Sequence, residues 1–277
     1  MINGKTTLIA HLGYPTESFK APLIYNPWFD SKGIDAVVVP MGVKAEDYAA
    51  FFGKVMKLSN IRGALVTMPH KVTTVGLLDE ASTAVKVAGS CNAVLVREDG
   101  RIVGDMFDGA GFARGLKRKG FDARGKSCLI SGTGGVGSAI AASLAADGVG
   151  HMALFDLNAA SADELARRLR QYHPAMRVTT RSNDPAGFDL IVNATPLGMK
   201  PGDPLPFEVS RIAKDTFVGE VVMKQEITPL LEAARRIGCP TQVGTDMLFE
   251  QIPAYLEFFG FGTTTADELR AVAKIKY

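Results

Sequence analysis

Three glycines near the middle of the chain are spaced as G-x-G-x-x-G, at Gly132, Gly134 and Gly137. An apolar run at 127–131 precedes them and predicts a strand, and small residues over 135–146 predict a helix. In this context the glycines permit a tight turn, close approach of the backbone to a pyrophosphate, and contact between helix and strand. The uncompensated N–H groups at the start of the helix would face the phosphates. The pattern therefore predicts a dinucleotide site.

A carboxylate follows at the spacing that such a site requires. Asp156 ends the next predicted strand, 152–155, and lies 156 − 137 = 19 residues after the last glycine. A carboxylate here would accept hydrogen bonds from the adenosine ribose and repel the extra phosphate of NADP. Leu157 and Asn158 supply no arginine, and Arg167 and Arg168 lie farther along the next predicted helix, so NAD is the predicted cofactor. Alternatively, Asp156 only caps that helix.

Three polar segments could serve the reaction itself, since a hydride transfer needs a proton acceptor beside the reacting carbon. Lys71 follows the predicted strand 63–68, Asn92 begins a predicted hairpin, and Asp108 lies between the two regular stretches of the chain. The ends of strands line the ligand crevice in α/β sheets. A structural alternative for Lys71 and Asp108 is an ion pair that only ties two domains together.

The elements that would position these residues alternate between strand and helix, which predicts parallel βαβ units. In the first stretch the predicted strands are 6–13, 36–41 and 63–68, with a helix at 45–58 and a hairpin of 91–96 and 101–103 that could form an antiparallel edge. In the second stretch, 108–245, further strands are predicted at 188–192, 217–222 and 241–243, and helices at 162–172 and 229–237. Residues 246–277 predict two helices interrupted at 259–264, the second with a capping box of Thr265 and Glu268.

Composition excludes several classes of protein. The 31 Lys and Arg nearly balance the 29 Asp and Glu, which argues against binding to nucleic acid or to a membrane surface. No apolar run reaches the ~18 residues of a membrane span, and no signal peptide is recognisable. Three separated cysteines and four scattered histidines predict neither disulfides nor a metal site. A cytoplasmic protein with a small-molecule substrate, monomeric or homodimeric, is the expectation.

Several motifs in register resemble the shikimate dehydrogenase family, which includes the quinate/shikimate dehydrogenases. The matching segments are Val66–Lys71 (Val-Thr-x-Pro-x-Lys), Asn92, Asp108-Gly109, Asn193–Met199 (Asn-Ala-Thr-Pro-x-Gly-Met), Thr228–Leu231 and Gly244–Gln251. Together they are much more specific than the glycine turn alone.

This resemblance implies an α/β protein of two domains with the active site in the cleft between them. A mainly parallel substrate domain would span 1–108 and be completed by the helices of 246–277, and a Rossmann-like NAD(P)-binding domain would span 109–245. Lys71 and Asp108 would form the acid–base couple. The implied substrate-binding positions are Phe19, Lys20, Ala21, Thr67, Asn92, Phe107, Met223 and Gln251. The expected cofactor-binding positions are Gly132, Thr133, Gly134, Gly135, Val136, Gly137, Asp156, Leu157, Asn158, Asn193, Ala194, Thr195, Val221, Gly244, Met247 and Leu248, although Met247 could equally be an ordinary core methionine.

The chain departs from the family pattern on the substrate side. Phe19 and Ala21 replace two serines that hold the shikimate carboxylate, although Lys20 is retained. Other family polar residues are replaced at Leu65, Met106, Phe107 and Met223, and an aspartate by Glu220. Losing hydrogen-bond partners changes substrate preference strongly. The sequence therefore predicts an NAD-dependent dehydrogenase of a cyclic hydroxy compound related to shikimate or quinate but different from shikimate.

Three alternatives remain open. The chain could be a genuine shikimate or quinate dehydrogenase that has drifted. It could be a non-catalytic NAD-binding sensor, although such a protein would not need Lys71 and Asp108. It could be a two-domain dehydrogenase of another kind, for instance one that acts on a folate, against which the intact Asn193–Met199 segment argues.

Overall fold

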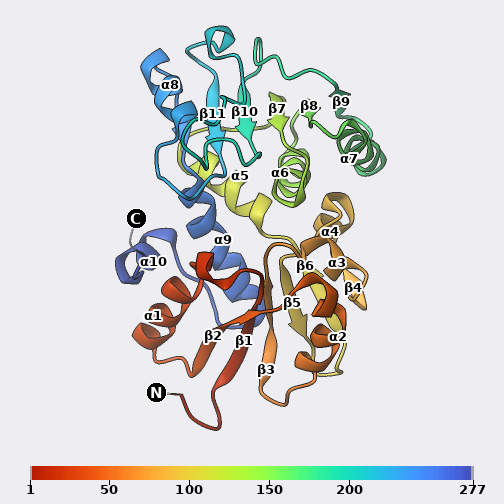
Figure 1. Cartoon of the computed structure of the whole chain (residues 1–277), viewed down its shortest axis with the longest axis vertical. Helices are drawn as coiled ribbons and strands as arrows, with labels where there is room; N and C mark the ends of the chain where they lie inside the picture. The colour runs from red at the N-terminus through yellow and green to blue at the C-terminus, as the bar shows by residue number, and fades with distance from the viewer. Residues whose placement is uncertain (1, 276–277) are drawn as a thin grey trace. The chain divides into compact units, whose positions relative to one another are not determined.

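The computed structural model describes residues 2–275. Met1 and residues 276–277, the last two of the predicted C-terminal helical stretch, lie outside the described residues. The described chain divides into two compact units, one of residues 2–107 and 252–275 and the other of residues 108–251 (Figure 1).

The first unit contains a six-stranded sheet in the order β2-β1-β3-β5-β6-β4. Strands β1, β2 and β3 pair in parallel, and β5 is antiparallel to both of its neighbours, β3 and β6. The strands are β1 (Thr7–Gly13), β2 (Ala36–Gly42), β3 (Ile61–Val66), β4 (Glu80–Ala81), β5 (Ala93–Val96) and β6 (Ile102–Asp105). The parallel strands therefore end together, at residues 13, 42 and 66. Phe19 follows the end of β1, and Thr67 and Lys71 follow the end of β3.

The predicted hairpin is present as β5 and β6, but it does not form an edge of the sheet. β4 pairs in parallel with β6 and takes the edge position. With only two residues, β4 is too short to show any hydrophobic alternation, and the sequence therefore gave no sign of it.

Helices of the first unit are α1 (Pro22–Lys32), α2 (Ala45–Val55), α3 (Lys71–Val75), α4 (Thr83–Ala88) and α10 (Ala266–Val272), with a short 3-10 turn, η1 (Thr16–Ser18). Helix α1 was not predicted from the sequence, because its internal Pro27 argues against a helix. Its buried Tyr25, Trp28 and Phe29 nevertheless hold it in the core. The predicted cap of α10 is confirmed, because the Thr265 side chain accepts a hydrogen bond from the Glu268 N–H.

The second unit contains six parallel strands in the order β12-β11-β10-β7-β8-β9. They are β7 (Ser127–Ser131), β8 (His151–Phe155), β9 (Arg177–Thr180), β10 (Leu190–Asn193), β11 (Phe217–Glu220) and β12 (Thr241–Gln242). Counted from β7, this is the strand order 3-2-1-4-5-6 of the doubly wound dinucleotide-binding fold. The order reverses between β7 and β10, and the glycine turn directly follows β7.

The helices of the second unit are α5 (Asp108–Arg118), α6 (Gly135–Ala146), α7 (Ala159–Tyr172) and α8 (Pro229–Ile237), with a second 3-10 turn, η2 (Val209–Arg211). Helix α9 (Gly244–Phe259) begins in this unit, and the boundary between the units follows its residue Gln251. Helix α5 was not predicted from the sequence, because its three glycines lower helix propensity. Close packing explains those glycines: a Cβ at Gly109 would lie 2.0 Å from the Ala139 carbonyl oxygen of α6.

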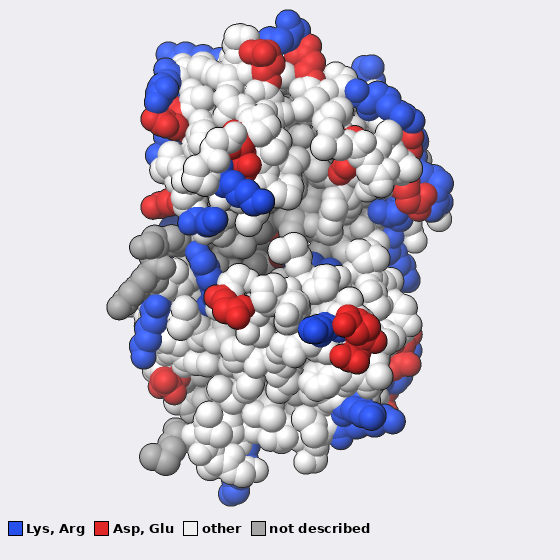
Figure 2. Space-filling model, in the orientation of Figure 1, with Lys and Arg blue, Asp and Glu red and all other residues white. Residues whose placement is uncertain are grey.

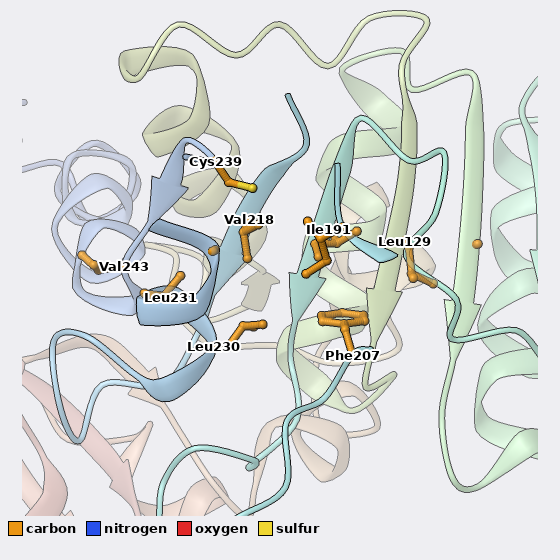
Figure 3. Packing of buried hydrophobic residues seen from close by; sticks show 11 residues of the cluster. Leu129, Ile191, Phe207, Val218, Leu230, Leu231, Cys239 and Val243 are labelled. Carbon is orange, nitrogen blue, oxygen red and sulfur yellow. The ribbon is translucent and has the colours of Figure 1, made fainter. Parts of the chain in front are cut away.

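A buried apolar cluster holds α8 and the following loop against the second sheet (Figure 3). Leu129, Ile191 and Val218 come from three neighbouring strands, and Leu230 and Leu231 of α8 pack against them. Burying such side chains contributes about 1.5–3 kcal/mol each relative to exposure. The cluster therefore keeps the carboxyl ends of β10 and β11 beside the N-terminus of α8.

Charged side chains of both signs are interspersed over the face that Figure 2 shows. No helix among residues 2–275 has the length and hydropathy needed to cross a membrane.

Candidate functional site

The glycine turn of 132–137 has the close backbone contacts that its pattern predicts. Gly132 has a φ of +95°, a conformation that favours glycine. A Cβ at Gly137 would lie 1.9 Å from the Gly132 carbonyl oxygen, so helix α6 could not pack against the turn with a larger residue there. At Gly134, by contrast, a Cβ would have no atom within 4 Å. Two glycines therefore serve the fold, and the third borders open space.

The start of α6 is suited to bind an anion. Gly134 is its N-cap residue and makes no side-chain capping bond, so no side chain of the cap competes for the first N–H groups of the helix. Ser138 turns its hydroxyl back to the Thr133 carbonyl oxygen at 2.9 Å. Open space at Gly134 and an uncapped helix N-terminus fit the pyrophosphate of a dinucleotide.

Asp156 is tied to the glycine turn by its carboxylate. The Thr133 N–H and hydroxyl donate to Oδ2 at 2.7 and 3.0 Å, and the Asn158 N–H donates to Oδ1 at 2.9 Å. Partial burial raises the pKa of Asp156, but these hydrogen bonds outweigh it and keep the pKa below its ordinary value. Asn158, not Asp156, is the N-cap residue of α7, so the alternative role of Asp156 as the helix cap is wrong.

The described residues that follow Asp156 offer no unpaired positive charge near its carboxylate. Leu157 is 95% exposed and Asn158 is also exposed. Arg167 and Arg168 both bond to Glu164 on their own helix. The position where an extra ribose phosphate would bind thus has an ionised carboxylate and an apolar side chain.

A buried carboxyl group, Glu220, organises the ends of β10 and β11. It accepts the Asn193 side-chain amide at 2.9 Å, the Thr228 hydroxyl at 2.9 Å, and the backbone N–H groups of Val221 and Val222 at 3.2 and 3.3 Å. Removal from water raises the pKa of Glu220 to about 7 in spite of these four donors. From the sequence, Glu220 stands out only as a departure from the family pattern, because its partners are distant in the chain.

Through Asn193 the same network extends into the loop after β10. Asn193 Oδ1 accepts the Thr195 N–H at 3.0 Å and its hydroxyl at 2.6 Å, and Asn193 Nδ2 also donates to the Leu197 carbonyl oxygen. A Cβ at Gly244 would lie 2.3 Å from the Val222 carbonyl oxygen, so α9 begins against the segment that follows β11. The structure thus brings together Asn193, Thr195, Val221 and Gly244. Ala194 lies beside Gly132, while Met247 and Leu248 are buried in α9.

Lys71 is the first residue of α3 and is held by its backbone. Its carbonyl oxygen accepts the Cys91 N–H at 2.8 Å. The neighbouring His70 donates its Nε2–H to the Val43 carbonyl oxygen at 2.8 Å, and its ring stacks on Tyr48 with centroids 3.8 Å apart. The Tyr48 hydroxyl bonds Thr74 at 2.7 Å. This buried network fixes the short helix that carries Lys71.

Asn92 and Phe107 are connected within the first unit. Asn92 Oδ1 accepts the Phe107 N–H at 2.9 Å, and the Asn92 carbonyl oxygen accepts the Tyr255 hydroxyl at 3.1 Å. Asn92 Nδ2 is buried and has no hydrogen-bond partner among residues 2–275. The Phe107 ring packs edge-on against Tyr255 and Phe258. A buried amide donor without a partner is the feature expected of a group that awaits a ligand.

Phe19 lies on His11, a residue that was not among the predicted site residues. The two rings stack with centroids 4.0 Å apart and an angle of 28° between their planes. A Cβ at Gly13 would lie within 3 Å of Phe19 Cζ and of Thr67 Cγ2, so both side chains reach the end of β1. His11 could have been noticed as a polar residue inside the apolar predicted strand 6–13. Lys20 and Ala21 follow directly, and Ala21 is the N-cap residue of α1.

The remaining predicted residues lie in the second unit. Asp108 is the first residue of α5 and is buried. Met223 follows β11, and Gln251 is a buried residue of α9 whose Oε1 has no hydrogen-bond partner in the described part of the chain. Other groups of the protein interact with Lys71, Asp108 and Met223.

The strand order, the glycine turn and Asp156 together define a Rossmann-type nicotinamide dinucleotide-binding protein. Residues 12–94 match the model of the shikimate dehydrogenase substrate binding domain. A shikimate dehydrogenase (NADP(+)) of Rubrobacter xylanophilus is 33% identical over 254 residues, which cover 90% of this chain and 89% of that protein. The chain belongs to the shikimate dehydrogenase family.

Two solved structures extend the comparison. Shikimate 5-dehydrogenase from Listeria monocytogenes, in complex with shikimate and NAD, is 28% identical with a TM-score of 0.91, and the match covers 98% of this chain and 97% of that one. The ligand-free 5-ketofructose reductase of Gluconobacter sp. strain CHM43 is 26% identical with a TM-score of 0.88, and 98% of each chain is covered. Proteins named for different substrates therefore share the fold of this chain.

Proposed function

We propose that this oxidoreductase transfers hydride between NAD and a cyclic hydroxy compound that resembles shikimate or quinate but differs from shikimate. The observation that carries the proposal is the Phe19 ring, stacked on His11 where the family has a serine that holds the shikimate carboxylate. Ala21 stands at the position of the second serine. A site that loses such partners discriminates against the original substrate by orders of magnitude.

The preference for NAD rests on Asp156. Its ionised carboxylate would accept the adenosine ribose hydroxyls and repel a ribose phosphate. The exposed Leu157 offers no charge to compensate. The Rubrobacter relative is named for NADP(+), whereas the Listeria structure contains NAD, so the family includes both cofactors.

The cofactor, when bound, supplies the hydride acceptor. Gly132, Gly134 and Gly137 with the start of α6 would hold its pyrophosphate, together with Thr133, Gly135 and Val136 of the same turn. The segments around Thr195 and Val221, which Glu220 and Asn193 tie together, would border the nicotinamide.

Lys71 and Asp108 are proposed as the acid–base couple. Each would bond the substrate hydroxyl that becomes a carbonyl, and one of them would take its proton as the hydride leaves. Asn92 Nδ2, buried and without a partner, would donate to a second oxygen of the substrate. Thr67, Lys20, Phe107, Met223 and Gln251 complete the proposed substrate contacts.

Similarity to a 5-ketofructose reductase favours a substrate that lacks the carboxylate of shikimate. That protein is named for a keto sugar, which has no carboxylate, and its structure matches 98% of this chain. An uncharged substrate of this kind would not need the two serines that Phe19 and Ala21 replace here.

Steady-state kinetics of the purified chain test the proposal. We expect turnover of a cyclic polyol, hydroxy acid or keto compound with a kcat/KM at least about tenfold higher with NAD than with NADP, and weak turnover of shikimate. Efficient turnover of shikimate would show a genuine shikimate dehydrogenase. Tight NAD binding without turnover of any such compound would support the sensor instead.

A further inference from the structure

The ring of His11 has an unusual position for a polar side chain. It stands at the carboxyl end of β1 among Ala10 and Leu12, is only 7% exposed, and pairs in register with Leu65 of β3. Phe19, half-buried, covers one face of the ring at a centroid distance of 4.0 Å. The ring is thus removed from water by the residue that replaces the family's serine.

One nitrogen of that ring has no partner. His11 Nδ1 is buried and makes no hydrogen bond within the described chain. An unsatisfied buried polar atom costs its full desolvation penalty, and a leucine or valine at this position would avoid that cost. No described residue supplies a partner to Nδ1, so a hydrogen-bonding group from outside the chain would satisfy it.

His11 and Phe19 lie near other residues proposed for the substrate site, namely Lys71 and Thr67. The positive charge of Lys71 acts on His11, and Phe19 and Thr67 converge on Gly13, two residues after His11. Strands β1 and β3 are parallel neighbours, so His11 and the segment that leads to Lys71 share one end of the sheet.

Charge decides which ligand fits. Burial, and to a smaller extent Lys71, lower the pKa of His11 to about 3, so the imidazole is neutral at working pH. A neutral ring offers a single hydrogen bond at Nδ1 and no positive charge for a carboxylate. The face of the Phe19 ring carries partial negative charge and disfavours an anion.

We propose that His11 and Phe19 form a specificity-determining pair in the substrate site: His11 Nδ1 hydrogen-bonds a hydroxyl or carbonyl oxygen of an uncharged polyol or keto sugar, and Phe19 occupies the region where a carboxylate would be held. The inference rests on the proposed function and narrows its substrate class. Lys20 is the competing group, since its ammonium could hold a carboxylate without the serines.

Two experiments on the full chain test the pair. In kinetics with NAD and NADP, the panel is myo-inositol, 5-ketofructose, shikimate and quinate. We expect uncharged members to be preferred, and His11→Leu to raise their KM about tenfold or more. The KM for NAD should stay unchanged, and the midpoint of thermal unfolding should not fall, because leucine avoids the cost of the unsatisfied Nδ1. His11→Asn, which places a polar atom near Nδ1, should keep the KM within about threefold of wild type. His173→Leu, at the end of α7, is the matched control.

The second experiment needs no turnover. The chain has four histidines, so the ring signals of isotope-labelled histidine can be followed by NMR, and His11→Asn identifies the signal of His11. We expect titration with myo-inositol or 5-ketofructose to shift the His11 signal, and titration with shikimate or quinate to leave it in place.

The outcomes separate this inference from the proposed function. A shifted His11 signal without turnover of any panel member would overturn the proposed function and keep the binding role of His11. Turnover with an unchanged His11 signal and an unchanged KM in His11→Leu would overturn the inference alone. A preference for shikimate or quinate that Lys20→Ala abolishes would also overturn it, and a panel that neither reacts nor shifts the signal would overturn both.

Discussion

The side-chain amide of Asn193 donates a 2.9 Å hydrogen bond to the buried carboxyl group of Glu220, which joins the ends of β10 and β11. These residues are 27 positions apart, and their strands are parallel neighbours in register. Asn193 also holds Thr195, and Glu220 also holds Thr228 at the start of α8. One buried pair therefore determines the shape of the surface proposed for the nicotinamide.

Stability should depend on pH through Glu220. Its pKa rises from 4.5 to about 7 on folding, so between these values the folded state binds more protons than the unfolded state. The contribution of protonated Glu220 to the free energy of unfolding is therefore complete below 4.5, its pKa in the unfolded state. This contribution is lost as the pH rises through about 7. A shift of this size corresponds to about 3 kcal/mol.

Urea unfolding of wild type and Glu220→Gln between pH 4.5 and 8 measures this effect. The free energy of unfolding of wild type should fall relative to that of the variant across the interval. Glu226→Gln, which changes an exposed glutamate, is the control and should follow wild type. Parallel curves for wild type and Glu220→Gln would contradict the prediction.

Replacement of Asp156 should change the choice of cofactor. Asp156→Ala removes a charged acceptor for the ribose hydroxyls, and bonds to charged groups contribute about 1.5–3 kcal/mol. We therefore expect the KM for NAD to rise about tenfold or more, with little change or an improvement for NADP. Asp163→Ala is a matched control, because Asp163 lies on α7 and bonds Thr180 and Arg181. Equal loss with both cofactors would show that Asp156 only supports the turn through Thr133.

Two glycines of one turn should respond differently to alanine. In Gly137→Ala the new Cβ would meet the Gly132 carbonyl oxygen at 1.9 Å, so we expect a loss of stability of about 2 kcal/mol or more. In Gly134→Ala the Cβ enters open space at a φ of −68°, so stability should change by less than about 1 kcal/mol. The KM for NAD should nevertheless rise severalfold, because the methyl group occupies space proposed for the pyrophosphate.

Thermal unfolding and NAD titration of the two variants check this contrast. An unchanged KM for NAD in Gly134→Ala would place the pyrophosphate elsewhere.

Turnover should depend on Lys71 and Asp108 separately from cofactor binding. Lys71→Met and Asp108→Asn each remove a group proposed to exchange a proton with the substrate, and such groups contribute about 10²–10⁴-fold. We expect kcat to fall by that range while the dissociation constant of NAD stays within about twofold, as measured by fluorescence titration. Lys86→Met, an exposed lysine on α4, is the control. Full activity of Lys71→Met would leave Lys71 with a structural role.

Local features of the sequence predicted the local features of the structure well. The strand 127–131, the turn and the helix 135–146 were predicted at their observed bounds, because each is defined by neighbouring residues. Elements without a local signal were missed: β4 is two residues long, α1 contains Pro27, and α5 contains three glycines whose packing partners lie on other elements.

The sequence by itself determined the family, the glycine turn and the position of Asp156, since these depend on residue types at short, regular spacing within a βαβ unit. Only the tertiary structure decided which distant groups meet. The order of the strands sets Glu220 beside Asn193 and Thr228, and the turn after β1 folds Phe19 back onto His11. Side-chain partners of this kind follow from three-dimensional packing, in which burial gives a carboxyl group or a ring nitrogen properties that its place in the sequence does not carry.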